Sequence, residues 1–599
     1  MKSKRLGRYL VIALLAAWGV VTIAALGGMY KLWWDRERVN YSGKTVDEQR
    51  LAVWKNSGLS EVLLGVNDKV QADWPRYISY SATGDHNQLS YLKYLLIPRI
   101  PAGSDIYSID ANGSFAPAGI QDEQVAPPQP KRFSFTGFVV SFLAVSGMTL
   151  VLQRSILSIP FSFPEMFGCA SLFLMGCVVV SRALFATAVP AFYLLAATGL
   201  LSWIALAIGK VRSKADISRC SINCGCHADV VVRRRSFKLL LNTLLIGILA
   251  LSVLWVLLMS VIVVPDDWDA WAIWAAKAKV LALGRGPLFD VSYFGHADYP
   301  LLWPSVWAFS GWLGGGWEEM WSRGWAGIFL LLCIWEMVII IARTTGRKDL
   351  GLLGGALFVS MPMTPLIASW SYAETPFWML TVSCIGSLRL WRSDNSRLPL
   401  VVAAVLAAGA AYTKNEGLLF TVLASFWILL TPGKQRLPAL VLFASCFFVL
   451  YFPWFYWIKI VLKLGSHATA GLHLDHENFL RIADRIPKAV ESIFGMWSEI
   501  KRWNIVLWVT CVYAVFGCVK KGYRTDLMLP LGMLLGYLVI VVFHNDDIYW
   551  QIGTSWDRLT VQTMPLLLIV LVPHTWKLLI SATGGEDISG SGSGAALYL

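Results

Sequence analysis

Residues 238–271 read KLLLNTLLIGILALSVLWVLLMSVIVVPDDWDAW, an apolar run that stops at a proline and is followed at once by aspartates and tryptophans. The run from 238 to 264 is long enough to cross a bilayer as an α-helix, which needs about 20 mostly apolar residues. Pro265 ends the run, and Asp266, Asp267 and Asp269 form an acidic cluster beyond it. The stretch predicts a membrane span that carries acids to a membrane surface.

The composition of the whole chain extends this prediction. Of its 599 residues, 56% are hydrophobic and only 15% are charged, and the mean hydropathy is +0.57. A water-soluble globule could not cover so much apolar surface. Lipid offers the backbone no hydrogen-bond partners, and the long apolar runs lack the alternation of strands, so a helical bundle is favoured over a barrel. We expect an all-α polytopic membrane protein.

The formal charge of +13 would suggest nucleic-acid binding in a soluble protein. Here the basic residues occupy short segments between apolar runs, a pattern that orients a membrane protein and attracts anionic lipid. We therefore expect membrane lipids as partners and no nucleic acid.

Runs of about 17 to 25 apolar residues predict the spans. There are about fourteen, near 9–34, 134–153, 163–186, 188–209, 238–264, 319–343, 349–368, 373–392, 398–413, 417–431, 437–462, 504–520, 527–544 and 559–580. The run 301–316 is expected to be interfacial or re-entrant, because counting it as a span would invert every later loop.

Charge distribution tests this order of spans. The basic segments 2–8, 210–238, 343–348, 389–397, 432–436 and 520–524 all fall on one side, which the positive-inside rule makes cytoplasmic. The opposite side receives DDWDAW (266–271), HADYPLLWP (296–304), SYAETP (371–376), TKNEG (413–417) and the segment 544–558. We predict a multi-pass protein of a bacterial inner membrane whose functional site faces the periplasm.

The chain is expected to have two main parts. Residues 1–237 form an N-terminal membrane region with a small periplasmic insertion at 35–133. Residues 238–583 form a second membrane module with periplasmic loops at 265–318, 463–503 and 544–558. The low-complexity stretch 584–599 has the composition of an expression-tag remnant and carries no argument.

The acidic cluster opens the segment PDDWDAWAIWAAKAKVL, which also carries Trp271 and Lys277. Asp267 suits the N-cap of a short helix lying along the membrane surface, where a carboxylate avoids the roughly 3 kcal/mol cost of the bilayer centre. One aspartate could be only a cap, and the tryptophans could be only an aromatic belt. Three aspartates within four positions favour a functional role.

The other motifs supply further candidates for binding a substrate. HADYPLLWP contributes His296, Asp298 and Tyr299, SYAETP contributes Glu374, TKNEG contributes Lys414 and Glu416, and SWDR contributes Ser555 and Arg558. Taken singly, Glu374, Lys414 and Glu416 are explained equally well by helix-end caps and salt bridges.

Arg558 lies near the expected outer surface, against the positive-inside trend, so a bound partner is expected. Its planar guanidinium suits a phosphate, and the alternative is an ion pair with Asp557, Asp546 or Asp547. His544, Asp546 and Asp547 could hold a divalent cation, Mg²⁺ or Mn²⁺, although their spacing matches no specific ligand pattern.

As an ordered set, DDWDAWAIWAAKAK, DYPLLWP, SYAETP, TKNEG and SWDR resemble the family-39-like glycosyltransferases of the C superfamily over about residues 238–580. The resemblance implies a polyprenyl-phosphate-linked sugar donor, a glycan, lipid or protein acceptor, and inverting transfer at the outer face. It also implies a catalytic acid in the first outer loop, which corresponds to Asp266, Asp267 or Asp269. This chain lacks the Asp-Glu pair that is common there, so the resemblance does not say which one.

The residues agree with such a transfer reaction. A base must take the proton of the acceptor hydroxyl, and positive charge must stabilise the departing lipid phosphate. An outer aspartate suits the first role, and Arg558, Lys414 or a divalent cation suits the second. Two other functions remain open, namely a flippase or transporter of lipid-linked saccharides, and a polymerase or ligase that transfers a whole glycan.

Overall fold

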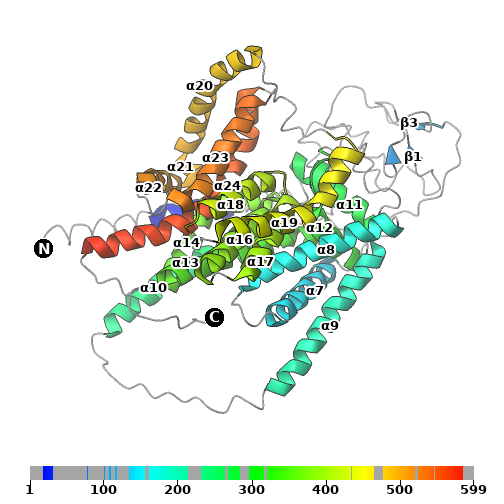
Figure 1. Cartoon of the computed structure of the whole chain (residues 1–599), viewed down its shortest axis with the longest axis horizontal. Helices are drawn as coiled ribbons and strands as arrows, with labels where there is room; N and C mark the ends of the chain where they lie inside the picture. Colours follow the sequence, from blue (N-terminus) through cyan, green and yellow to red (C-terminus); the bar gives the residue numbers. More distant parts are fainter. Residues whose placement is uncertain are drawn as a thin grey trace.

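The computed structural model describes most of the helical part of the chain. The described residues are 18–31, 77–78, 100–101, 107–109, 115–117, 134–155, 161–185, 187–213, 231–263, 267–283, 296–315, 317, 320–394, 396–432, 435–464, 476–519, 524–544 and 547–583. They form a helical bundle with two pairs of short strands (Figure 1).

The strands all fall within the expected insertion at 35–133. Strands β1 (Tyr77–Ile78) and β2 (Ile100–Pro101) pair in parallel. Strands β3 (Tyr107–Ile109) and β4 (Phe115–Pro117) pair antiparallel. The rest of this segment lies outside the described residues, so its role as a periplasmic subdomain stays a prediction.

The first described helix covers residues 18–31 and carries no label. It is followed by α7 (Ser134–Ser155), α8 (Phe163–Phe185), α9 (Val189–Ser213), α10 (Val231–Ile262), the π-helical turn η2 (Ala270–Ala275), α11 (Ala276–Leu283) and α12 (Leu302–Leu313).

The remaining helices complete the bundle. They are η4 (Trp321–Gly324), α13 (Trp325–Thr345), α14 (Lys348–Val359), α15 (Met363–Ser369), α16 (Glu374–Asp394), α17 (Arg397–Ala411), α18 (Glu416–Leu430), α19 (Arg436–Phe455), η5 (Tyr456–Val461), α20 (His476–Ser498), α21 (Ile500–Trp503), α22 (Val506–Val519), α23 (Arg524–Phe543) and α24 (Ile548–Thr583).

Helices occupy every range expected to hold a span, which confirms a polytopic helical architecture. Within the described residues, eight helices are long and apolar enough to cross a membrane, or nine if α14 and α15 form one span bent by 69°. The bend falls at Pro362, which precedes α15, as expected where a proline interrupts a helix. Helices α17, α18 and α22 are apolar but shorter. The count of fourteen stays a prediction.

Burial separates central from peripheral helices. In the apolar span of α24, 83% of the residues are buried, and in α13 72%, against 28% in α9 and 22% in the span that contains α19. Figure 1 shows α9 along one edge of the bundle. Helix α12, expected to be interfacial or re-entrant, is buried against α7, α8 and α11. Helices α13 and α24 are therefore central: α13 packs against α8, α10, α14 and α16, and α24 packs against α14, α16, α20, α22 and α23.

The ends of the helices divide by charge. Helix α16 begins at the SYAETP motif, and at its other end Arg392 lies 3.4 Å from Asp526 in α23. Helix α24 carries SWDR near its start, and near its end the guanidinium of Arg347 lies 4.1 Å from the ring centre of Trp576. The motif segments and these basic loops thus occupy opposite ends of the same helices.

Gly417 sets the close approach of α17 and α18 beside the TKNEG turn. A Cβ atom at this position would lie 2.4 Å from the backbone carbon of Ala410. Real Cβ atoms do not approach backbone so closely, so α18 would have to move. By contrast, a Cβ atom at Gly176 in α8 would meet nothing within 4 Å.

We expect Gly417→Ala to destabilise the protein by about 1 to 3 kcal/mol, the usual cost of overpacking. Gly176→Ala should leave stability unchanged or raise it, because alanine is the better helix former. Thermal unfolding of both variants in detergent, followed by size-exclusion fluorescence, measures the difference. Equal midpoints for the two variants would contradict the packing described here.

Candidate functional site

The acidic segment folds as a turn that leads into a buried helix. The amide groups of Ala270 and Trp271 both donate to the carbonyl of Asp267, at 3.1 and 3.4 Å. Asp267 and Asp269 are half-buried, whereas Trp271 and Trp274 are each 2% exposed. These two tryptophans are therefore part of the protein core, not an aromatic belt facing lipid headgroups. The π-helical turn η2 is of a kind frequently found at functional sites.

Arg558 joins α24 to the acidic turn. Its guanidinium forms an ion pair with Asp269 and lies 5.0 Å from the ring centre of Tyr372. The Tyr372 hydroxyl donates a hydrogen bond to Asp267. Burial, together with the charges of Asp269 and Asp267, raises the pKa of Tyr372 well above its usual value, so the phenol stays protonated. The described aspartates are thus bridged by one cation and one phenol.

Arg558 does not pair with the described aspartates near it in the sequence. Asp557, its neighbour in the chain, instead binds Arg502. Asp547 accepts a hydrogen bond from the backbone amide of Trp550 at 2.8 Å and so caps the first turn of α24. Asp546 lies outside the described residues. The partner of Arg558 is Asp269, 289 residues away in sequence.

Lys414 is the second cation of the site. Its ammonium group lies 2.7 Å from Glu374 and 3.1 Å from Glu416, with side-chain exposures of 7%, 1% and 18% in that order. Burial alone would lower the pKa of Lys414, but the charges of Glu374 and Glu416 outweigh it and raise the pKa. One oxygen of Glu374, Oε2, is buried without a hydrogen-bond partner among the described residues. Such an orphan acceptor in a polar cleft marks a place for a ligand or water.

The HADYP turn, residues 296–300, is hydrogen-bonded to α11 and to the TKNEG turn. Lys277 donates to the carbonyl oxygens of His296 and Tyr299 at 2.8 and 2.7 Å, and Asn415 donates to Asp298 at 2.9 Å. The rings of His296 and Tyr299 stack with centres 4.8 Å apart. Lys277 therefore positions this turn.

The charges around Tyr299 show that the motifs meet in one place. Burial raises the pKa of Tyr299 well above its usual value, and the nearby charges of Glu416, Asp269 and Asp298 raise it further. These three acids come from three separate motifs. The polar segments predicted to share one face of the membrane therefore form a single network.

Arg323, which the motif analysis missed, holds this network together. It is 1% exposed; its guanidinium donates to the Ser371 hydroxyl at 2.6 Å, to the Ser369 carbonyl at 3.1 Å, and to the carbonyl of Val263. It thereby ties the chain just before the acidic turn to the turn that carries Tyr372. An arginine at the outer end of the expected span 319–343, against the positive-inside trend, was the available signal.

Some of the predicted residues lie apart from the network or outside the described residues. Ser555 is half-buried and lies 3.5 Å from the Thr554 hydroxyl. His544 is buried, and Asp547 is the helix cap described above. Asp266 and Asp546 lie outside the described residues. No group of three or more His, Cys, Asp or Glu side chains suited to a metal ion occurs among the residues that could be searched.

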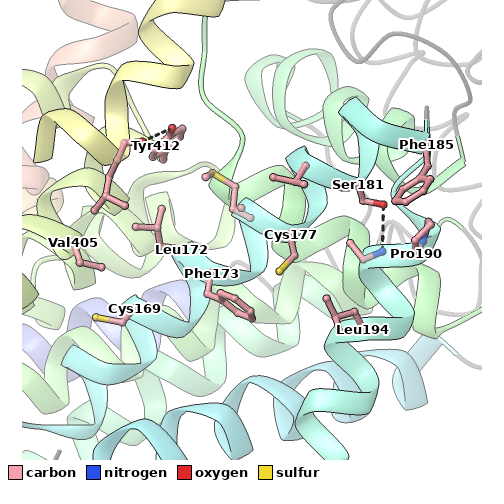
Figure 2. A pocket seen from close by; sticks show the side chains of 15 residues that line it. Cys169, Leu172, Phe173, Cys177, Ser181, Phe185, Pro190, Leu194, Val405 and Tyr412 are labelled. Carbon is pink, nitrogen blue, oxygen red and sulfur yellow. Dashed lines mark hydrogen bonds between the residues drawn. The ribbon is translucent and has the colours of Figure 1, made fainter. Parts of the chain in front are cut away.

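An apolar pocket of about 610 Å³ lies between α8, α9, α17 and α19 (Figure 2). It is lined mainly by apolar side chains, among them Leu172, Phe173 and Leu194. Tyr412 also lines it, and its hydroxyl donates to the carbonyl of Leu450 at 2.9 Å. Tyr412 lies two residues before Lys414 in the chain, so one of the lining residues directly precedes the TKNEG turn.

In comparisons with known proteins, no family model, no curated protein and no solved structure matches this chain. Its architecture is that of a helical multi-pass membrane protein. The glycosyltransferase resemblance stays a prediction that rests on the ordered motifs.

Burial lowers the pKa of Lys277 from 10.5 to about 7. Between these values the unfolded chain holds a proton that the folded chain has released, so the folded state gains stability as the pH rises above 7. We expect the melting temperature of the wild type, relative to that of Lys277→Met, to rise between about pH 6.5 and about pH 9. Scanning fluorimetry of both proteins measures this difference. A difference that stays flat or falls with pH would mean that Lys277 is a charged lysine throughout.

Proposed function

We propose that this protein is an inverting glycosyltransferase that moves a hexose or pentose from a polyprenyl-phosphate donor to an acceptor hydroxyl. The observation that carries the proposal is the network in which Asp269 pairs with Arg558, Tyr372 binds Asp267, and Lys414 pairs with Glu374. An apolar pocket is lined in part by Tyr412, which precedes the TKNEG turn. Acid, cation and apolar surface are the three features that such a donor and its reaction need. The acceptor is a cell-envelope glycan, a lipid or a protein.

In the proposed reaction, the acceptor hydroxyl attacks the anomeric carbon of the sugar while an aspartate takes its proton. The bond between that carbon and the phosphate oxygen breaks, and polyprenyl phosphate leaves with the bonding electrons. Attack from the side opposite the phosphate inverts the anomeric centre. A positioned base of this kind contributes about 10²- to 10⁴-fold to the rate.

The contacts support Asp267 over Asp269 as the base. Asp269 is held in an ion pair by the guanidinium of Arg558. Asp267 accepts a hydrogen bond from the neutral phenol of Tyr372. Asp266 stays a third candidate, because it lies outside the described residues.

Arg558 and Lys414 are the proposed phosphate ligands. Each is already paired with carboxylates, so the phosphate must displace an existing ion pair to reach them. The apolar pocket beside Tyr412 is the proposed place for the isoprenoid chain, since its lining offers few polar groups. This arrangement leaves the phosphate at the end of the bundle that we propose faces the periplasm.

The charge balance of the network supports participation of a divalent cation. Five carboxylates, those of Asp267, Asp269, Asp298, Glu374 and Glu416, lie in this network with Arg558 and Lys414 as its paired cations. A lipid phosphate adds further negative charge. We propose that Mg²⁺ or Mn²⁺ enters together with the donor and balances it.

A flippase or transporter is the second candidate function. One observation favours it: Glu165 and Glu336 are fully buried within α8 and α13, and acids inside membrane helices are typical of transport pathways. A transporter would move a lipid-linked saccharide without releasing polyprenyl phosphate. A polymerase or ligase would release the polyprenyl carrier but transfer a whole glycan.

We expect purified protein in nanodiscs to release polyprenyl phosphate from radiolabelled polyprenyl-phosphate sugars only when bacterial envelope extract supplies acceptors. Asp267→Asn should lower this rate about 10²- to 10⁴-fold, and Arg558→Ala about 10²- to 10³-fold. Asp394→Asn, an exposed residue at the opposite end of α16, is the matched control. Full activity of both Asp267→Asn and Asp269→Asn would exclude them as the base, and saccharide movement without carrier release would favour a transporter.

We also expect EDTA to abolish donor turnover, and Mg²⁺ or Mn²⁺ to restore it, because the carboxylates outnumber the cations that face the donor. Binding of the sugar-free carrier, polyprenyl phosphate, should weaken under the same treatment. Native mass spectrometry of the protein with this carrier measures that step independently of catalysis. Turnover and binding that are both unchanged by EDTA would leave Arg558 and Lys414 as the whole phosphate site.

A further inference from the structure

A second pair of acids lies inside the bundle, away from the proposed active site. Glu165 is in the first turn of α8, and Glu336 is in the C-terminal half of α13. Both side chains are fully buried, with no exposed surface. Acids at such positions are costly and are usually functional in membrane proteins.

Hydrogen bonds explain why Glu165 can be buried. The backbone amide of Ser162 donates to Glu165 Oε2 at 2.6 Å, and the amide of Glu165 donates to the Ser162 hydroxyl at 3.2 Å. This reciprocal pair is a capping box, which satisfies the free amides at the start of α8. Ser387 in α16 also donates to Glu165 Oε1, at 2.7 Å. Both oxygens of Glu165 are therefore accepting hydrogen bonds.

The hydrogen bonds of Glu336 do not explain its burial in the same way. Its Oε2 accepts a hydrogen bond from the Ser162 hydroxyl, while its Oε1 is buried without a partner among the described residues. The unpartnered oxygen faces Gly386 of α16. A Cβ atom at Gly386 would lie 2.5 Å from Glu336 Oε1 and 3.3 Å from Glu165 Oε1. The two acids thus border the same small space, which exists because residue 386 has no side chain.

The groups around this space offer no directly bound cation. Within the described part of the chain, no lysine or arginine forms an ion pair with either acid. Arg343 of α13 acts on both only through longer-range charge, and Arg389 of α16 binds the Ile569 carbonyl and Asp526. The other titratable neighbours are the thiols Cys169, Cys333 and Cys384, from α8, α13 and α16. Two ionised carboxylates here would repel each other without compensation.

We infer that Glu165 and Glu336 bind one proton between them, carried on Glu336 Oε1 and donated toward Glu165 Oε1. Glu165 is the ionised partner, because its oxygens already accept hydrogen bonds from Ser162 and Ser387. Glu336 is the acid, because a proton on Oε1 gives that atom a hydrogen bond to donate. The junction of α8, α13 and α16 is therefore a proton-binding site. It is independent of the proposed sugar transfer.

The two acids should respond differently to replacement by glutamine. Glu336→Gln keeps the shape of the protonated acid, and its amide can donate toward Glu165. In Glu165→Gln the side-chain oxygen can still accept from the Ser162 amide, but its NH₂ group then replaces the oxygen that accepts from Ser387 and from the Glu336 proton. We expect Glu336→Gln to keep the wild-type melting temperature and Glu165→Gln to lower it.

The decisive measurement is infrared spectroscopy of the protein in nanodiscs, in D₂O near neutral pH. The wild type minus Glu336→Gln difference should contain the carbonyl band of one protonated carboxylic acid. That band should disappear as the pH is raised. Glu491→Gln, which alters an exposed glutamate of α20, should leave the acid band of the wild type intact. Gly386→Ala, which forces the two carboxylates apart, should weaken or shift the band.

Absence of an acid band from the wild type minus Glu336→Gln difference would overturn the inference, because both acids would then be ionised. A second measurement compares the band in choline chloride with the band in sodium chloride. If the band is present in choline chloride and lost in sodium chloride, the site binds Na⁺ in place of a proton, and the inference is likewise overturned. Retention of the band in both salts supports the proton. None of these outcomes depends on whether sugar transfer is observed.

Discussion

Charge that is removed from water must be paired, and the polar end of this bundle is organised by that requirement. Arg558 in α24 meets Asp269 after α10, and Lys414 between α17 and α18 meets Glu374 at the start of α16. Each pair joins segments far apart in the sequence. An unpaired member would leave a buried charge, at a cost of several kcal/mol. These ion pairs therefore fix the relative positions of the helix ends that form the site.

The same requirement explains residues that have no direct part in the proposed chemistry. Arg323 satisfies three acceptors around the turns at 263 and 369–371, and Lys277 satisfies two in the HADYP turn. Both are buried side chains whose donors bind mainly backbone carbonyl groups. Arg323 links the chain before Asp267 to the turn that carries Tyr372, and Lys277 holds the HADYP turn. A site made from loops thereby acquires the rigidity of the helices beneath it.

The ion pairs also affect how the proposed enzyme would bind the phosphate of its donor. A phosphate that reaches Arg558 or Lys414 replaces a carboxylate already bound there, so donor binding and rearrangement of the ion pairs are a single event. The carboxylate displaced from Arg558 would be Asp269, whereas Asp267, the proposed base, is bound by Tyr372. The apolar pocket lined by Tyr412 is the proposed place for the lipid chain.

By itself, the sequence determined the class of the protein and the composition of its polar end. Apolar runs of sufficient length predict helices, and helices are found at those ranges, because lipid leaves the backbone no alternative. The charge bias of the loops grouped Asp267, Glu374, Lys414 and Arg558 correctly at one end. These features depend on local composition, which is visible along the chain.

Only the tertiary structure decided which of these residues touch. Arg558 binds Asp269 and not the adjacent Asp557, Trp271 and Trp274 are buried and do not form an aromatic belt, and Ser162 donates hydrogen bonds to both Glu165 and Glu336. Such contacts depend on the rotation and register of one helix against another. Those are set by side-chain packing among segments distant in sequence, and the spacing of residues within a single segment does not record them.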